Sequence, residues 1–319
     1  NGLITKRTYQ GFVWQYAYKT GTALIDNIKN IDGQTVWYDY DGLMRLSKTW
    51  ARPSTAGSYA TANVTTEYTY QYKNATNTYN YVKTRSTFAA AAGSSLTEKT
   101  IWQYMDGLGR TLQTVDQKHS PGQKDLISAI EYDNLGRAFK QYEPFESANN
   151  TGAYTAPYGL FTTTQYETSP LSRVISVTNP LGFVSTTAYG ANSTTLTVPS
   201  GTAYSANTLL RSTVTNADSE IMDTYVDKKG RKILERRHVV NNSSYADTYF
   251  QYDDKDRLSK VVPPGVLASQ TALMYTYTYD GADRITQKTV PDAGTMKYRY
   301  DNRDLVTYTQ DANMSPANK

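Results

Sequence analysis

The sequence predicts an all-β fold built from antiparallel β-hairpins, and two observations lead to this prediction. Tyrosine is unusually frequent, with 29 residues against 7 Phe and 4 Trp in a chain of 319. Tyrosine favours pleated strands because its bulk near Cβ packs well on a half-buried sheet surface. In addition, a short pattern of tyrosine, aspartate and arginine recurs along the chain. Such recurrence is typical of a repeat array rather than of unrelated domains.

The composition also predicts a sheet without a thick apolar core. Hydrophobic residues make up 39% of the chain, and the mean hydropathy is −0.61. A tyrosine ring buries apolar surface while its hydroxyl group stays available to water. We therefore expect both faces of the sheet to be partly wet.

The repeat is a strand that ends in aromatic-Asp, followed by three loop residues, Arg and an apolar residue. The clearest copies are Tyr40-Asp41 with Arg45, Tyr132-Asp133 with Arg137, Tyr252-Asp253 with Arg257, and Tyr279-Asp280 with Arg284. Two copies keep the tyrosine one residue earlier, namely Tyr104-Met105-Asp106 with Arg110 and Tyr225-Val226-Asp227 with Arg231. Two weaker copies run from Tyr166-Glu167 to Arg173 with extra loop residues, and from Tyr300-Asp301 to Leu305 where Arg is expected.

These eight copies predict hairpin turns near residues 41–45, 106–110, 133–137, 167–173, 227–231, 253–257, 280–284 and 301–305. Longer gaps separate the first copy from the second and the Glu167 copy from the Asp227 copy. We expect eroded copies in these gaps, and the candidates are the segments 68–72 and 179–182.

Each part of the repeat has an expected structural role. Tyrosines alternate with polar residues before the Asp, as in Tyr275-Thr276-Tyr277-Thr278-Tyr279, and this period of two indicates a strand. A three-residue hairpin loop commonly ends in a left-handed residue. That place holds Gly109, Gly136 and Gly230 or Asp256, Asp283 and Asp304. Glycine and aspartate adopt this conformation readily, whereas Met44 departs from the rule.

Aspartate and arginine should face each other across the neck of each hairpin. The carboxylate can accept bonds from turn amides, and the guanidinium opposite it closes the loop. An exposed pair contributes only about 0–1 kcal/mol, so we expect it to set register more than stability. The predicted structural turn residues are Asp41, Arg45, Asp106, Gly109, Arg110, Asp133, Gly136, Arg137, Asp227, Gly230, Arg231, Asp253, Arg257, Asp280, Arg284 and Asp301.

An isolated hairpin is marginally stable, so neighbouring hairpins must pair edge to edge. We expect residues 1–319 to form one stretch of a continuous, coiled hairpin sheet without a separate catalytic domain. The chain starts and stops in mid-pattern, which indicates a segment of a longer polypeptide. Any targeting signal would then lie outside it.

Charge and residue usage exclude several classes of function. Thirty-three basic and 29 acidic residues are interspersed and give a net charge of +4. There is no basic stripe of the kind that nucleic-acid binding requires. Cysteine is absent, which excludes disulfides and thiolate metal sites. No apolar run is long enough to span a membrane as a helix.

The sequence offers little support for catalysis. His119 and His238 lie far apart without a metal-ligand or nucleophile pattern, and we expect each to be a surface loop or strand histidine. The acidic segments 39–41 and 253–256 raise the alternatives of a calcium site and a glycosidase pair. We favour a turn role, because the same aspartates recur in every repeat. The expectation is no enzyme, no metal and no cofactor.

At the repeat residues the sequence resembles the Rhs/YD-repeat family. The stretch from Tyr104 to Val115, followed by Glu131 to Arg137, resembles the large secreted YD-repeat proteins of the Bacteroidetes in particular. The resemblance implies a wall segment of a hollow β shell that encloses a polypeptide cargo such as a C-terminal toxin. It also implies a secreted or cell-surface location, contacts with other segments of the same polypeptide, and export by an outer-membrane type IX secretion translocon.

One feature departs from toxin-bearing relatives. Their shells end in a plug with a self-cleavage signature of the Asp-Pro-x-Gly-Leu type, and this sequence has none. The alternative function is an adhesion module that binds glycans or cell-surface partners through its Tyr-rich face. We favour packing of Tyr against Tyr on adjacent hairpins. A hydrolase on a β-propeller or a β-helix fits worst, because propeller blades repeat at about 40–45 residues and the coils of a parallel β-helix are shorter than these repeats.

Overall fold

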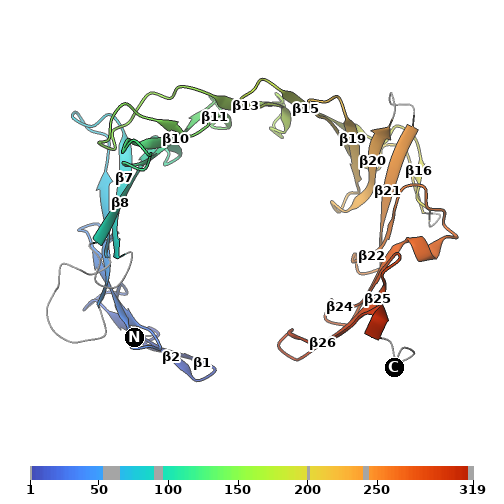
Figure 1. Ribbon diagram of the computed structural model, residues 1–319, viewed down its shortest axis with the longest axis horizontal. Coiled ribbons are helices and arrows are strands. Elements are labelled where there is room, and N and C mark those ends of the chain that lie inside the picture. The colour runs from blue at the N-terminus through green and yellow to red at the C-terminus, as the bar shows by residue number, and fades with distance from the viewer. Residues whose placement is uncertain (1, 53–64, 90–95, 200–201, 240–243, 315–319) are drawn as a thin grey trace. The chain divides into compact units, whose positions relative to one another are not determined.

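The computed structural model describes residues 2–52, 65–89, 96–199, 202–239 and 244–314, and the statements below concern these residues (Figure 1). Twenty-four strands belong to one antiparallel sheet, and two short strands form a separate pair. The only other regular elements described are two short 3-10 helices, η1 and η2. The all-β, antiparallel hairpin fold predicted from the sequence is confirmed. None of the described helices is long and apolar enough to cross a membrane.

The chain divides into two compact units, Asn1–Thr163 and Thr164–Lys319. The strands of the first unit are β1 (Lys6–Tyr9), β2 (Phe12–Tyr18), β3 (Ile25–Lys29), β4 (Thr35–Tyr40), β5 (Leu46–Arg52), β6 (Thr65–Gln71), β7 (Asn80–Ala89), β8 (Leu96–Met105), β9 (Thr111–Asp116), β10 (Leu126–Tyr132), β11 (Ala138–Tyr142), β12 (Phe145–Glu146) and β13 (Phe161–Tyr166), the last of which extends past the division. From β1 to β11 each strand pairs antiparallel with the next. Strand β12 pairs with β10, and β13 pairs with β11.

The second unit repeats this plan. Its elements are β14 (Val174–Thr178), β15 (Val184–Ala191), β16 (Leu196–Thr197), β17 (Ala203–Tyr204), β18 (Leu210–Thr215), β19 (Ile221–Val226), β20 (Lys232–Val239), β21 (Ser244–Tyr252), β22 (Leu258–Val262), η1 (Thr271–Leu273), β23 (Tyr275–Tyr279), β24 (Ile285–Val290), β25 (Gly294–Tyr300), β26 (Val306–Gln310) and η2 (Ala312–Met314). Strands β14, β15 and β18 to β26 pair antiparallel in that order. Strands β16 and β17 pair with each other inside the connection from β15 to β18.

Because the chain reverses at every turn, successive turns in each unit alternate between the two ends of the strands. In the second unit, the turns that begin at Asp227, Asp253, Asp280 and Asp301 all lie on one edge, whereas those that begin at Asn179 and Asn216 lie on the other. In the first unit, the Asp41, Asp106 and Asp133 turns likewise share one edge. We call the row of strand ends that carries the aspartate turns the acidic edge, and the row of opposite strand ends the neutral edge. Neither name refers to an unpaired outer strand.

A β-bulge precedes the aspartate turns. The register shifts by one residue just before the turn, for example between Glu131 and Tyr132 and between Gln251 and Tyr252. A three-residue loop with a left-handed last residue produces such a bulge. The bulge bends the strand and thereby positions the tyrosine that precedes the aspartate.

Buried apolar residues form two small clusters, one in each unit. The first contains Tyr104, Val115 and Ile127, with Phe145 and Tyr154 packed against it. Both packing residues belong to the long connection 143–160 between β11 and β13, which folds back over the strands. Strands without such a cover keep half-buried side chains on both faces.

The second cluster has the same design. It contains Val198, Leu209, Tyr225, Ile233 and Leu234. The connection 192–209, which includes β16 and β17, supplies part of it and thus covers strands β19 and β20. The sequence did not predict either cluster.

Candidate functional site

The aspartate turns share one hydrogen-bond pattern, which the Asp133 turn illustrates. The main-chain N–H of Asp133 donates to the carbonyl of Arg137 at 2.9 Å, and the N–H of Gly136 donates back to Asp133 at 2.9 Å. Carboxylate atom Oδ1 accepts from the N–H groups of Leu135 and Arg137, both at 2.9 Å. Atom Oδ2 accepts from the Arg137 guanidinium, with Nε at 2.7 Å and Nη2 at 2.7 Å. The carboxylate therefore closes the turn and holds the arginine.

The other predicted Asp–Arg pairs are brought together in the same way. The Nε–Oδ2 contacts join Arg45 to Asp41, Arg110 to Asp106, Arg231 to Asp227, Arg257 to Asp253, and Arg284 to Asp280, at 2.6–2.8 Å. At the last copy Leu305 cannot make this bond, and Arg303 donates to Asp301 instead, with Nε at 3.1 Å.

The last loop residue has a left-handed backbone at every one of these turns. The φ angles are 81° at Gly109 and Gly136, 78° at Gly230, 65° at Asp256, 63° at Asp283, 62° at Asp304 and 61° at Met44. Met44 therefore adopts the conformation required by the turn in spite of its side chain. The wider loop that begins at Glu167 places Ser172 in the same region, with φ of 51°.

The hydrogen bonds of the turns lower the pKa of their carboxyl groups. For Asp253 the largest influence is the hydrogen bond from the Arg257 side chain. The side-chain bond from Arg173 lowers the pKa of Glu167 to about 2. The pKa of Asp301 is lowered as well, chiefly by the main-chain N–H of Leu305. Turn amides thus favour the carboxylate even where the arginine is missing.

A second set of contacts connects each repeat to the next, and the repeat from Arg257 to Tyr279 illustrates it. The guanidinium of Arg257 lies 4.7 Å from the centre of the Tyr279 ring, which is within the range of a cation–π interaction. The hydroxyl of Tyr279 donates to the carbonyl of Leu258, the residue after that arginine, at 2.8 Å. We call this combination the arginine–tyrosine link.

The link recurs in both units. Other arginine–tyrosine pairs are Arg45–Tyr70, Arg110–Tyr132, Arg173–Tyr189, Arg231–Tyr252 and Arg284–Tyr300, at 4.1–4.9 Å. In each, the tyrosine hydroxyl donates to the carbonyl that follows the arginine, at 2.9–3.0 Å. Tyrosine at the end of a strand therefore packs on arginine of the preceding repeat, whereas we expected Tyr–Tyr packing. Tyrosine pairs do occur in the first buried cluster, as between Tyr79 and Tyr154.

The left-handed residue of the next turn completes the link. Where it is aspartate it accepts a further bond from the preceding arginine: Arg257 Nη1 reaches Asp283 Oδ1 at 2.7 Å, and Arg284 Nη1 reaches Asp304 Oδ1 at 2.8 Å. Where it is Gly136, a Cβ atom would lie 2.3 Å from Nη1 of Arg110. Glycine as the left-handed residue thus leaves room for the arginine of the preceding repeat, whereas aspartate accepts a hydrogen bond from it.

The two candidate eroded copies behave differently. Tyr70 in segment 68–72 takes the tyrosine role toward Arg45. Segment 179–182 does form a turn of the same pattern, in which Asn179 Oδ1 accepts from the N–H groups of Leu181 and Phe183. However, this turn lies on the neutral edge, and the tyrosine role toward Arg173 falls to Tyr189.

Three more neutral-edge turns were missed in the sequence. They begin at Asn30, Ser120 and Asn216, and each uses its side-chain oxygen to accept from the N–H four residues later. The residues three places on, Gly33, Gln123 and Ser219, have positive φ. The signal that could have found them is an Asn or Ser three residues before a residue able to adopt the left-handed conformation.

The structure also explains why two copies have their tyrosine two residues before the aspartate instead of one. Tyr104 and Tyr225, which lie two residues before aspartate, are each 5% exposed and belong to the two buried clusters. Tyr104 donates its hydroxyl to the carbonyl of Gly152 at 2.7 Å. These tyrosines pack against the covering connections instead of the preceding arginine.

The alternative of a calcium site in segment 253–256 finds no support in its contacts. Asp253 is occupied by its turn and by Arg257. Asp256 forms ion pairs with Lys229 and Arg231 at 2.7 and 2.5 Å. Among the described parts of the chain, no cluster of three or more His, Asp or Glu side chains is suited to holding a metal ion.

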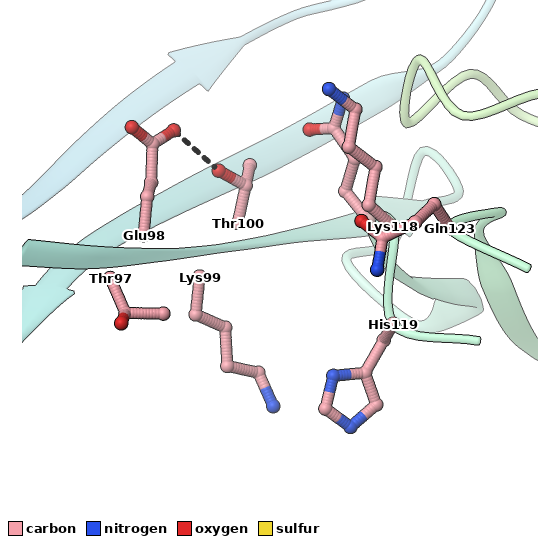
Figure 2. Close-up of a pocket in the computed structure, with 8 residues that line it drawn as sticks. Thr97, Glu98, Lys99, Thr100, Lys118, His119 and Gln123 are labelled. Atoms are coloured by element: carbon pink, nitrogen blue, oxygen red, sulfur yellow. Dashed lines mark hydrogen bonds between the residues drawn. The ribbon is translucent and has the colours of Figure 1, made fainter. Parts of the chain in front are cut away.

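A cavity of about 560 Å³ lies beside β8 in the first unit. Figure 2 shows that Glu98 and Thr100 project from one side of the strand, whereas Thr97 and Lys99 project from the other, together with His119 of the loop after β9. Successive residues of a strand point to opposite faces, so these side chains cannot converge on one small ligand. His119 is more than half exposed, with 56% of its side chain accessible.

A more convergent cavity of about 380 Å³ lies in the second unit, and we call it the polar cavity. One wall is the segment 192–197 of the covering connection, and the floor comes from strands β18 to β21, with Arg211, Asp223, Tyr225, Arg236, His238, Tyr245 and Tyr249. His238, for which a surface loop or strand position was expected, lies on strand β20 and is partly buried. Its side chain is 17% exposed, and Nε2 lies 3.0 Å from Oδ2 of the buried Asp223.

The fold and the turn geometry define a repeat protein of β-hairpins joined by arginine–tyrosine links. Comparisons with known proteins gave one family match and several similar solved structures. Residues 77–182 match a family described as "Domain of unknown function (DUF6443)". No curated protein sequence matches the chain.

Two solved structures are similar over 95% of this chain. The crystal structure of TcdB2-TccC3 has a TM-score of 0.71 at 14% sequence identity, and this chain spans 17% of it. The Tc holotoxin pore of Photorhabdus luminescens, solved with a TccC3 variant, has a TM-score of 0.68 at 13% identity, with 19% of it spanned. At these identities the similarity establishes the fold, and the chain corresponds to less than a fifth of each relative.

Proposed function

We propose that this chain is a structural wall segment of an Rhs-type shell in a large secreted protein, and that it is not an enzyme. The observation that carries the proposal is the similarity to TcdB2-TccC3 over 95% of the chain. The repeat chemistry supports it, because the described turn carboxylates and arginines are used in holding the wall together.

The arginine–tyrosine links suit a wall that must stay closed. Each strand pair supplies main-chain hydrogen bonds, and each link adds a cation–π contact and a hydroxyl bond between consecutive hairpins. Charged and aromatic side chains thereby take over a role that a thick apolar core has in a globular domain. Such a wall can remain thin, with both faces available to solvent or to cargo.

The proposal includes a polypeptide cargo, such as a toxin at the C-terminal side, and other segments of the same polypeptide as partners. One structural relative is described as a holotoxin pore, which supports this part. The resemblance to YD-repeat proteins of the Bacteroidetes extends the proposal to export through a type IX translocon and to a secreted or cell-surface location.

Electron microscopy of the full-length polypeptide that contains this chain tests the proposal. We expect a closed hollow particle with density inside, and a cargo segment that resists protease until the particle is opened by denaturant. An open rod, or a cargo segment cleaved at the same rate as a free peptide, contradicts the shell function. The alternative, adhesion through an exposed Tyr-rich face, predicts the rod.

A further inference from the structure

The polar cavity is not explained by the architecture of the wall. Its floor takes charged residues from three neighbouring strands, at Arg211 of β18, Asp223 of β19 and Arg236 of β20, and Asp247 of β21 lies beside Arg236 in the sheet. Asp223 is opposite Arg236 in the sheet, and Arg236 is opposite Asp247. Asp223, Arg236 and Asp247 have side chains that are 6%, 24% and 17% exposed, and Arg211 beside them is 38% exposed. Burying such charges has a desolvation cost, and the architecture of the wall does not explain why they gather here.

Most of these charged groups have an ion-pair or hydrogen-bond partner in place. Arg236 forms a two-point ion pair with Asp247, with both contacts at 2.8 Å. Asp223, 4% exposed, accepts from Thr213 with one oxygen and faces His238 with the other. The hydroxyl of Tyr249 donates to Asp247 at 3.0 Å. The side chains of the floor therefore hold one another in position.

Arg211 is the exception. Its Nε is buried and has no hydrogen-bond partner among the residues that the structure describes. The nearest ion-pair contact recorded for it is Oδ1 of Asp223 at 3.9 Å, which is too long for a hydrogen bond. Since Asp223 already binds Thr213 and lies against His238, Arg211 presents a guanidinium with unused donors to the cavity. A carboxylate can pair with such a group through two parallel hydrogen bonds.

The remaining lining points to hydroxyl groups on the ligand. Ser193, Thr194 and Thr195 are exposed on the wall, and hydroxyl side chains both donate and accept. Tyr245 is half exposed, and its ring is in contact with the Arg236 guanidinium at 4.3 Å and, in a T-shaped arrangement, with the His238 ring at 5.0 Å. An aromatic face so fixed can pack against the C–H face of a sugar ring.

We infer that the polar cavity binds an acidic saccharide of the uronic-acid class. Its carboxylate pairs with Arg211, its hydroxyl groups bond to the wall, and its ring lies against Tyr245. The volume of about 380 Å³ is within the range of small-ligand sites. A peptide carboxylate fits less well, because the aliphatic lining is limited to Leu196. The inference goes beyond the wall function and does not depend on it.

Nuclear magnetic resonance titration of this chain with glucuronate tests the inference. We expect saturable shifts at the resonances of Arg211, Thr194 and Tyr245, and at least about tenfold weaker binding of glucose, which lacks the carboxylate. Glucose binding as well as glucuronate, or shifts that avoid these residues, overturns the inference. Acetate or a short peptide with a free C-terminal carboxylate binding as tightly as glucuronate also overturns it, and the peptide result assigns the cavity to a polypeptide.

Matched variants locate the binding. Arg211→Gln should weaken glucuronate binding about tenfold or more while leaving any glucose binding unchanged. Arg237→Gln is the control, because Arg237 is exposed and adjacent to Arg236 on the same strand, and therefore points to the opposite face. Equal affinity of Arg211→Gln and the wild-type chain refutes the inference. The titration of the wild-type chain stands alone if Arg211→Gln does not fold.

Discussion

The two edges of the sheet carry turns with the same backbone and different chemistry. On the acidic edge Asp133 accepts from Leu135 and Arg137 main-chain N–H groups, and on the neutral edge Asn179 accepts from Leu181 and Phe183 in the same positions. The distances are 2.9 Å in the Asp133 turn and 3.0 Å in the Asn179 turn. An amide oxygen therefore makes this turn as well as a carboxylate does.

The difference lies in what the side chains do beyond their own turn. The residue four places after the first residue of the turn is arginine at most acidic-edge turns. At the asparagine turns it is Gln34, Phe183 or Glu220. The acidic-edge arginines hold their own aspartate and the tyrosine of the next repeat. Aspartate and arginine are thus needed for connecting hairpins, not for reversing the chain.

A fall in pH should produce the largest difference in stability between the turns of the acidic edge and those of the neutral edge. The pKa of Asp253, Asp280 and Glu167 is lowered by hydrogen bonds from their arginines, for Glu167 to about 2. A folded-state pKa below the unfolded value of about 4 means that stability is present above pH 4 and lost as the pH falls through the folded values. Asparagine turns do not titrate.

We therefore expect the melting temperature, followed by circular dichroism, to fall steadily from about pH 4 to about pH 2. Hydrogen exchange after a brief acid step should show earlier opening at the main-chain N–H of Arg284, on the acidic edge, than at that of Phe183, on the neutral edge. A melting temperature that stays constant over this range of pH contradicts the stabilising role of these carboxylates.

Removal of one arginine should have the next largest effect. Arg231→Ala deletes the pair with Asp227, the pair with Asp256 and the contact with Tyr252, and it leaves the 8% exposed Asp227 without its cation. We expect a loss of about 2 kcal/mol in urea unfolding. The control is Phe183→Ala, because Phe183 lies four residues after Asn179 as Arg231 lies four residues after Asp227. This change should alter the free energy of unfolding by less than about 0.5 kcal/mol. Equal losses in the two variants would show that the edges do not differ.

Alanine in place of the left-handed glycine distinguishes the edges by a smaller amount. Gly136 and Gly182 have φ of 81° and 85°, so both Gly136→Ala and Gly182→Ala should lose about 1–2 kcal/mol from the backbone. Only at Gly136 would the new Cβ meet an arginine of the preceding repeat. We expect Gly136→Ala to lose roughly 1 kcal/mol more, measured as the difference in free energy of unfolding. An equal loss at both glycines excludes this contact.

The hydroxyl of the link should have the smallest effect. Tyr252→Phe keeps the ring under Arg231 and removes the 3.0 Å bond to the carbonyl of Lys232. The expected loss is about 0.5–1 kcal/mol. Tyr9→Phe is the control, because Tyr9 is 60% exposed and should tolerate the change without a measurable loss. If Tyr252→Phe is as stable as the wild-type chain, the contact between the ring and Arg231 accounts for all of the stabilisation by this link.

Much of the acidic edge was predictable because its turns are local. Asp133 and Arg137 are four residues apart, and the loop residues between them decide the backbone. The asparagine turns at Asn30 and Asn216 are just as local, but without the arginine they lack a pattern that stands out from chance. The expected Tyr–Tyr packing occurs in the first buried cluster, but the arginine–tyrosine link was not predicted, because Tyr279 and Arg257 are 22 residues apart and meet only through the pairing of β22 with β23.

The polar cavity was beyond prediction for the same reason. Arg211, Asp223 and His238 come from three strands, and only the register of β18, β19 and β20 aligns them. The sequence by itself determined the hairpins, their turns and the all-β class, because these depend on residues within a few positions of one another. The tertiary structure alone decided which repeats are linked by which tyrosine, where connections cover the sheet, and where charges gather, because these depend on pairing between distant segments.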